Sequence, residues 1–108
     1  MRIIIKIDRE QLAVINQLME QIDHLDIYAQ PKHLKSVVAL CIELRELLLR
    51  KAISVRNRTK PFKLSLKYYM AEALYRYMNE FYIYWNTDTG SYEENVYTII
   101  QTQLHQKL

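Results

Sequence analysis

The order of predicted elements in this chain occurs twice, and this repetition constrains the fold more than any other feature. An alternating apolar segment at residues 2–7 precedes two helical patterns, and residues 62–66 start the same order again 59 residues after the first. Self-similarity at a fixed offset is typical of architectures assembled from one supersecondary unit. We therefore expect two strand-helix-helix repeats, at residues 1–53 and 62–108, joined by a connector at residues 54–61.

Length and composition predict a single domain. Half of the 108 residues are apolar, which is enough for one hydrophobic core but not for two independent ones. We therefore expect the two repeats to be halves of one domain spanning residues 1–108. The longest apolar run, residues 37–53, carries five charged side chains and is predicted to be a core helix, because charges are costly inside a bilayer. The first residues lack the features of a signal peptide, so no membrane association and a cytoplasmic location are expected.

Both strands are predicted from the alternation of apolar and other side chains, which is typical of a strand with one buried face. The side chains expected to point inward are Ile3, Ile5, Ile7, Phe62, Leu64 and Leu66. A lone strand leaves both of its edges unpaired, so the economical arrangement pairs the two segments. Such a ribbon is marginal alone and needs helices beneath it. The predicted fold is α+β and mostly helical: two strand-helix-helix units, related by an approximate two-fold axis, with a two-stranded antiparallel ribbon packed on four helices.

The four helices are predicted from capping signals and apolar periodicity. The first begins after Asp8, which can form a capping box with Gln11, and the last begins after Ser91, which also heads a capping-box sequence. Pro31 favours the start of the second helix, and the third is expected at about residues 67–85. The expected buried stripes, in helix order, are Leu12, Ile15, Leu18, Met19 and Ile22; Leu34, Val37, Val38, Cys41, Leu44 and Leu48; Met70, Leu74, Tyr77, Met78 and Phe81; and Tyr92, Val96, Ile99 and Ile100.

The cations are unevenly distributed along the chain. The net charge is only +3, but residues 50–67 contain seven lysines and arginines and no acid. This stretch covers the connector and the outer face of the second strand, and Arg2 and Lys6 join it if the strands pair. Such a surface can hold a polyanion because fixed cations release counterions from phosphates; the alternative is a solvated basic edge that prevents aggregation. The candidate DNA-binding residues are Arg2, Lys6, Arg56, Arg58, Lys60, Lys63 and Ser65.

Eight of the nine tyrosines fall within residues 68–97. Three of them, Tyr68, Tyr75 and Tyr82, recur every seven residues beside the core stripe of the third helix, and we call them the tyrosine row. Aromatic side chains with a polar tip are common at interfaces, so this row is a candidate surface for a homodimer or a protein partner. Two alternatives are core packing with the hydroxyls reaching water, and a stacking platform for bases, which the nearby Glu72 and Glu80 disfavour.

The sequence predicts no catalytic, metal or cofactor site. Cys41 lies on an apolar helical face and is expected to be a buried, reduced thiol. The three histidines, His24, His33 and His105, lack the spacing of a metal site and are expected at the surface. The single glycine, Gly90, leaves no glycine-rich phosphate loop, which argues against nucleotide enzymes. We therefore expect a protein without enzymatic activity, cofactor, metal or small-molecule substrate.

The alternating strand at residues 2–7, the helix capped by Asp8 and the second strand at residues 62–66 together resemble the ribbon-helix-helix family of DNA-binding repressors. That family pairs two chains into an antiparallel ribbon that enters the major groove. The resemblance implies a single-chain tandem pseudo-dimer. Carried over, the side chains facing DNA are Arg2, Ile4, Lys6, Lys63 and Ser65. The sequence departs from the family at Glu93 and Glu94, which open the last helix where the family's amides anchor a phosphate.

Two functions of different class therefore follow from the sequence. The first is a small DNA-binding or regulatory protein that uses the basic ribbon to bind duplex DNA. The second is a protein-interaction or assembly module that uses the tyrosine row.

Overall fold

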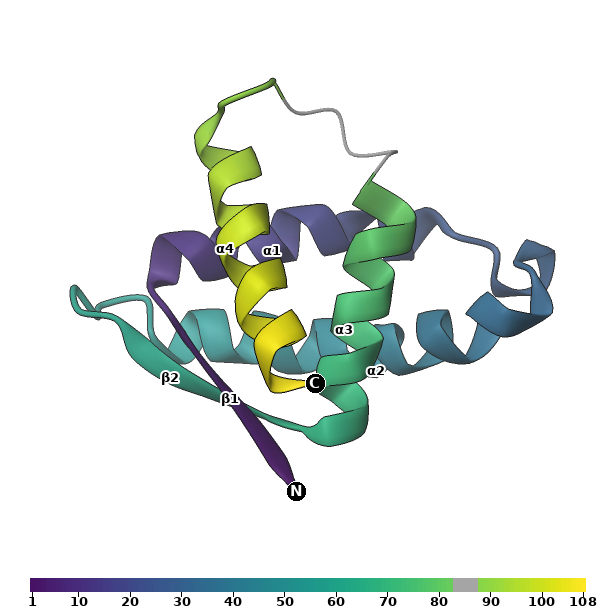
Figure 1. Cartoon of the computed structure of the whole chain (residues 1–108), viewed down its shortest axis with the longest axis horizontal. Coiled ribbons are helices and arrows are strands. Elements are labelled where there is room, and N and C mark those ends of the chain that lie inside the picture. The colour runs from purple at the N-terminus through teal and green to yellow at the C-terminus, as the bar shows by residue number, and fades with distance from the viewer. Residues whose placement is uncertain (83–87) are drawn as a thin grey trace.

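Two short strands and four α-helices form the part of the chain that the computed structural model describes, residues 1–82 and 88–108 (Figure 1). The elements follow in the order β1 (Arg2–Ile7), α1 (Arg9–Met19), η1 (Glu20–His24), η2 (Ile27–Ala29), α2 (Lys32–Ser54), β2 (Phe62–Lys67), α3 (Tyr68–Phe81) and α4 (Tyr92–Lys107), where η marks a 3₁₀ helix. The expected α+β, mostly helical fold with one two-stranded antiparallel sheet is confirmed.

The ribbon has the register that its inward-facing side chains require. Ile5 and Leu64, which the 59-residue offset relates, lie opposite each other, with Ile3 opposite Leu66 and Ile7 opposite Phe62. All six of these side chains are buried, whereas the alternate residues on both strands are exposed. The alternation in the sequence therefore predicted the buried face of both strands correctly.

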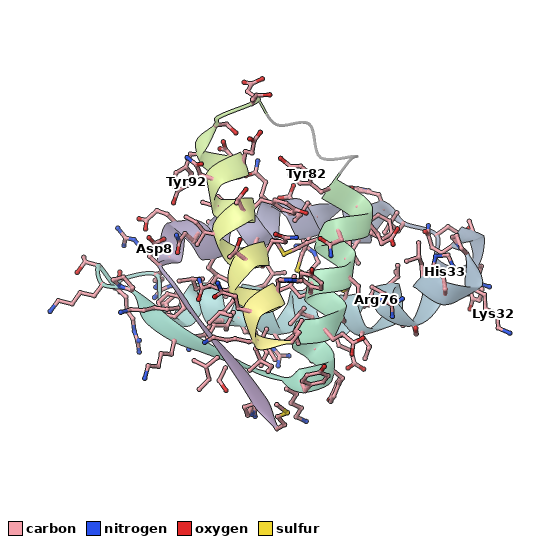
Figure 2. All side chains as sticks on the ribbon, in the orientation of Figure 1. Asp8, Lys32, His33, Arg76, Tyr82 and Tyr92 are labelled. Carbon is pink, nitrogen blue, oxygen red and sulfur yellow. The ribbon has the colours of Figure 1, made fainter. Side chains whose placement is uncertain are left out.

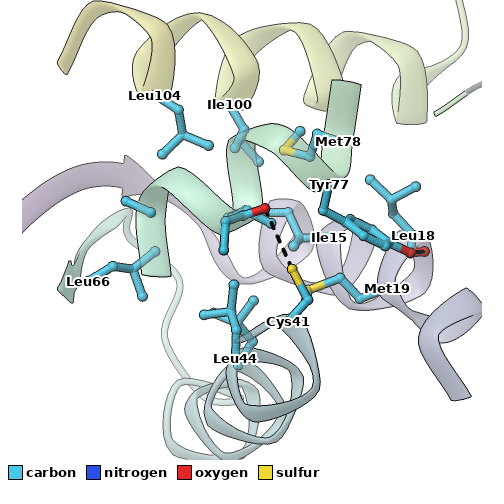
Figure 3. Packing of buried hydrophobic residues seen from close by; sticks show 14 of the residues in the cluster. Ile15, Leu18, Met19, Cys41, Leu44, Leu66, Tyr77, Met78, Ile100 and Leu104 are labelled. Carbon is cyan, nitrogen blue, oxygen red and sulfur yellow. Dashed lines mark hydrogen bonds between the residues drawn. The ribbon is translucent and has the colours of Figure 1, made fainter. Parts of the chain in front are cut away.

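The helices form two layers. In Figure 1, α1 and α2 run side by side across the molecule, and α3 and α4 cross over them. The hydroxyl of Tyr77 on α3 donates a hydrogen bond of 3.0 Å to the carbonyl of Leu18 on α1. The thiol of Cys41 on α2 lies 3.5 Å from the carbonyl oxygen of Ala73 on α3 (Figure 3). The core therefore lies between the two layers and under the apolar face of the ribbon.

The helix starts follow the capping chemistry of the sequence. The amide of Gln11 donates to the carboxylate of Asp8 at 2.8 Å, and the amide of Asp8 donates to the side chain of Gln11 at 2.9 Å, which is a complete capping box. Ser91 caps α4 by accepting from the amide of Glu94. Pro31 occupies the N-cap position of α2. The helix expected to Trp85 is described to Phe81, and the remainder of that prediction falls on residues 83–87, outside the described residues.

Three of the four predicted stripes are buried as expected, and the fourth is partly wrong. Every residue predicted inward on α1, η1, α2 and α3 is buried. On α4, however, the buried stripe is Val96, Ile100 and Leu104, whereas Tyr92 is 51% exposed and Ile99 is 45% exposed. Ile99 lies about 100° around the helix from Ile100 and so points away from the core. Tyr92 lies in the first turn, which extends past α1 in Figure 1.

Among the described residues, no helix has both the length and the apolar character that crossing a bilayer requires.

Candidate nucleic-acid interface

The outer face of the ribbon carries two pairs of like charges. Arg2 lies opposite Lys67, and Lys6 lies opposite Lys63. Between these two pairs, Ile4 lies opposite Ser65. All six residues are exposed, with Ile4 at 40%. The antiparallel register therefore brings four of the chain's cations onto one small surface, which we call the basic ribbon face.

Lys6 and Lys63 face each other as one of the two kinds of residue pair in an antiparallel sheet, the kind in which the opposing side chains lie closer together. The amide of Lys6 donates to the side-chain oxygen of Gln103 at 2.9 Å, and its carbonyl accepts from the side-chain nitrogen of Gln103 at 2.9 Å. Both backbone groups of Lys6 thus point away from β2, so Lys6 and Lys63 are a non-hydrogen-bonded pair, in which opposing side chains approach most closely. Like charges in this position destabilise a sheet. A bound anion would remove that repulsion.

The connector carries further cations near the start of β2, where Arg58 and Lys51 lie by the inward-facing ring of Phe62. Arg58 lies over the ring of Phe62 at 5.9 Å from its centroid, and Lys51 lies at 5.5 Å from it. The carbonyl of Arg56 accepts a 2.7 Å hydrogen bond from Arg9. Lys60 is exposed, and the connector residues Asn57, Arg58, Thr59, Lys60 and Pro61 line a hollow of about 310 Å³. All seven candidate DNA-binding residues of the sequence are therefore exposed, on the ribbon or in the connector that leads into it.

The structure adds two cations that the sequence reasoning did not select. Lys67 belongs to β2 and faces Arg2, and a strand prediction longer by one residue would have included it. Lys107, in the last turn of α4, donates a hydrogen bond from its Nζ to the carbonyl of Ile4. No local sequence signal could have found Lys107, because it reaches the ribbon from 103 residues away.

The acids that open α1, next to the end of β1, are engaged by neighbouring groups. The carboxylate of Asp8 caps α1. Glu10 forms a 2.9 Å ion pair with Arg9, and its hydrogen bond with Arg9 holds the pKa of Glu10 below its ordinary value. The sequences of β1, β2 and the connector themselves contain no acid. The basic ribbon face therefore keeps its positive charge.

The starts of α2 and α4 do not flank the ribbon as the family resemblance implies. Figure 2 shows Lys32 at the end of α2 that lies away from both strands. Glu93 and Glu94 occupy the first turn of α4, and the last turn of that helix is the one that contacts the ribbon. The amides that open α2 and α4 are thus distant from the basic ribbon face, and phosphate contacts would have to come from side chains.

The tyrosine row contacts other parts of this chain. The hydroxyl of Tyr75 lies 2.8 Å from Nδ1 of His105 on α4. The ring of Tyr82 stacks on Tyr97 with 3.9 Å between centroids, and Tyr68 packs against the core. All three residues of the row are half-buried. This placement matches the alternative of core packing that the sequence left open.

The expected surface histidines and buried cysteine are confirmed. His24, His33 and His105 are exposed, and Cys41 is buried, which raises the pKa of its thiol to about 12. Over residues 1–82 and 88–108, no three histidine, cysteine or acidic side chains lie together as a metal site would require. No family model, curated protein or solved structure matches this chain.

Proposed function

We propose that the protein binds duplex DNA through the basic ribbon face. The observation that carries the proposal is the register, which places Arg2 opposite Lys67 and Lys6 opposite Lys63 at a cost in intrinsic stability. A phosphate backbone converts this repulsion into attraction and releases its condensed counterions. The charge and the shape of the ribbon support this proposal, because contacts with the phosphate backbone position a protein on a duplex before any base is read.

The dimensions of the ribbon suit the major groove. A groove of about 12 Å admits a two-stranded ribbon. Arg2 and Lys6 are four residues apart along β1, so the two cationic pairs lie about 13 Å from each other. Ile4 and Ser65 lie between them and would meet the base edges, Ile4 by contact with a thymine methyl and Ser65 by a hydrogen bond.

Cations outside the strands extend the contact to the neighbouring phosphates. Arg56, Arg58 and Lys60 precede the start of β2, and Lys107 lies beside the edge of β1 that does not pair with β2. Side chains of this kind fix the position of a protein on a duplex without reading its sequence. With four to six phosphate contacts, the logarithm of the binding constant should fall against the logarithm of salt concentration with a slope of about −4 to −5.

The test is fluorescence anisotropy with a mixed-sequence DNA duplex, titrated between about 50 and 200 mM salt. The combined variant Lys6→Glu with Lys63→Glu should lose binding while its circular dichroism stays unchanged. The matched control is Lys32→Glu with Lys35→Glu, which makes the same change in charge at the other end of α2 and should keep binding within a few fold. Absence of binding at 50 mM salt, or an equal loss in the control, would contradict the proposal.

A comparison of duplex types tests the role of the groove. The major groove of A-form RNA is too narrow and deep for side chains to read. Double-stranded RNA of the same length should therefore bind more weakly than DNA at equal salt. Equal affinity for both would mean that the ribbon contacts phosphates alone and does not enter a groove.

The tyrosine row has less support as a functional surface. Tyr75 and Tyr82 already contact α4, so a partner could use them only by displacing these contacts.

A further inference from the structure

The outward side of α2 carries aliphatic side chains that no described element covers. Ile42, Leu49 and Ile53 are 49%, 42% and 64% exposed. Together with Glu46 they follow the spacing i, i+4, i+7 and i+11, so the four residues form one line along the helix, which we call the α2 ridge. Single exposed aliphatic residues are ordinary, but a row of three on one helix face is typical of a helix that packs against another.

A hollow with unbalanced charge lies along one flank of the ridge. It has a volume of about 320 Å³ and is lined by Glu43, Glu46, Leu47, Arg50 and Met70. Arg50 pairs with Glu46, and both side chains are largely exposed. Glu43 makes no ion pair with any described residue. The flank therefore combines two apolar side chains, Leu47 and Met70, with two carboxylates and one guanidinium.

We propose that the α2 ridge binds a second copy of this chain, with the two α2 helices antiparallel about a two-fold axis. In an antiparallel pair, residues face each other at a constant sum of their numbers, so Ile42 can face Ile53 of the second copy, and Glu46 then faces Leu49 of that copy. The two ridges thus place aliphatic contacts at both ends of the interface. A helix of 23 residues is about 34 Å long, which gives room for this contact along the helix.

The charges on the flank select this orientation. A two-fold axis perpendicular to the helices brings the same flank of both copies together. In the antiparallel pair, Arg50 of each copy lies beside Glu43 and Glu46 of the other, so every charge on the flank gains an opposite neighbour. In a parallel pair, the two-fold axis runs along the helices and brings opposite flanks together, so Arg50 would not meet Glu43 or Glu46 of the other copy. The pattern is complementary to itself in one orientation only.

The free edge of β2 is a poorer surface for a second copy. If two β2 strands paired antiparallel around Ser65, Lys63 of one chain would lie opposite Lys67 of the other. Like charges on an edge strand oppose such pairing. The α2 ridge also contains none of the seven candidate DNA-binding residues, so the proposed dimer is independent of the proposed DNA function.

Sedimentation velocity over a range of concentrations tests the dimer. The wild-type chain should dimerise, and Leu49→Glu should raise the dissociation constant by roughly tenfold or more, because the substitution removes an aliphatic contact and places a carboxylate opposite Glu46 of the other copy. The matched control is Ile99→Glu, at a residue of α4 with 45% exposure, which should leave the dimer unchanged. A wild-type chain that stays monomeric at hundreds of micromolar, or a dimer that Ile99→Glu weakens as much as Leu49→Glu, would overturn the proposal.

Disulfide cross-linking tests the orientation. In a mixture of Ile42→Cys and Ile53→Cys chains, the antiparallel pair should give the heterodimeric cross-link between the two variants. A parallel pair would instead give cross-links within each variant alone, and that result would refute the arrangement. Cys41 does not interfere because it is buried and its thiol pKa is raised to about 12.

Reversing the charges on the flank tests the contribution of the flank to dimerisation separately from that of the aliphatic residues of the ridge. Arg50→Glu should weaken the dimer because it brings three carboxylates of each copy together. Combining it with Glu43→Arg and Glu46→Arg should restore dimerisation, since the pattern is then complementary again with the signs reversed. If the triple variant stays monomeric while its fold is intact, the proposed flank contact is wrong. DNA binding measured on the same variants shows whether the two proposals fail separately.

Discussion

The side chain of Gln103 makes the two hydrogen bonds to Lys6 that a neighbouring strand would otherwise make. Its oxygen accepts from the amide of Lys6 and its nitrogen donates to the carbonyl of Lys6, both at 2.9 Å. One more bond from Lys107 satisfies the carbonyl of Ile4 on the same edge. The edge of β1 is thereby closed to further strands by a helix, which is one of the ways in which proteins prevent edge-to-edge association.

We expect Gln103→Ala to lower the free energy of unfolding by about 1 kcal/mol, at the low end for two hydrogen bonds because water can reach this edge. Urea denaturation would measure the change. Gln106→Ala is the control, at an exposed residue of the same helix whose side chain forms no hydrogen bond with any described residue, and it should be neutral within about 0.5 kcal/mol. Equal effects of the two substitutions would mean that the contact with Lys6 contributes nothing to stability.

Stability and DNA binding should respond in opposite directions to Lys63→Glu. The new carboxylate lies opposite Lys6, and an opposite-charge pair across two strands is worth roughly 0.2–1 kcal/mol, so the free energy of unfolding should rise. Duplex affinity should fall because one phosphate contact becomes a repulsion. Thermal denaturation and anisotropy on the same sample measure both.

The control for this prediction is Lys60→Glu, in the connector, where the ladder pairing places no residue opposite. It should weaken DNA binding without raising stability. A destabilised Lys63→Glu variant would show that the repulsion between Lys6 and Lys63 is not significant.

The ion pair of Asp23 with Arg45 predicts a loss of stability in acid. Arg45 donates from Nε and Nη2 to the two carboxylate oxygens at 2.9 Å each, which lowers the pKa of Asp23 from its ordinary 3.8. A lowered pKa in the folded state stabilises the protein above the unfolded value, and this contribution is lost as the pH falls through the folded value. The advantage of the wild type over Asp23→Asn should therefore be present at pH 7 and vanish in acid.

Denaturation curves between pH 7 and pH 2 would measure this difference. Glu20→Gln is the control because Glu20 is exposed and forms no ion pair with any described residue. Its difference from the wild type should not change over the same range. An advantage over Asp23→Asn that persists undiminished at the lowest pH would contradict the assignment of this stability to the ion pair.

The thiol of Cys41 should react only when the protein opens. Its burial raises the pKa to about 12, and the thiolate is the reactive form, so a thiol reagent at pH 8 should label the folded protein very slowly. Denaturant should accelerate labelling in proportion to the unfolded fraction. Rapid labelling without denaturant would show that the interface between α2 and α3 opens locally. A Cys41→Ala chain checks that all labelling occurs at this residue.

Local patterns in the sequence were sufficient for most of the fold. Strand alternation and helical periodicity report which side of an element is apolar, and for β1, β2, α1, α2 and α3 the apolar side is the buried one. On α4 the pattern was misleading because Tyr92 and Ile99 are apolar but are not covered by any described element. Periodicity identifies candidates for burial, whereas the packing of the other elements decides which of them are covered.

For the candidate site, too, local patterns predicted some of the residues, whereas others depend on the packing of distant elements. The cations on the outer face of the ribbon followed from alternation together with the assumption of antiparallel pairing, and the register supports that assumption. Gln103 and Lys107 could not be predicted, because they contact residues of β1 that lie 97 and 103 positions earlier in the sequence. The tyrosine row was identified by its spacing, but spacing alone does not show that α4 covers part of it.

The contacts that close the edge of β1 also set an order of events during synthesis. The first strand leaves the ribosome early, but its ladder partners at residues 62–67 come much later, and the groups that seal its other side, on Gln103 and Lys107, come later still. Until residues 62–67 emerge, the segment Ile3–Ile7 is a largely apolar β-forming stretch without a ladder partner, and until residues 103–107 emerge its other edge stays open. Completion of this domain therefore waits for residues 103–107 to emerge.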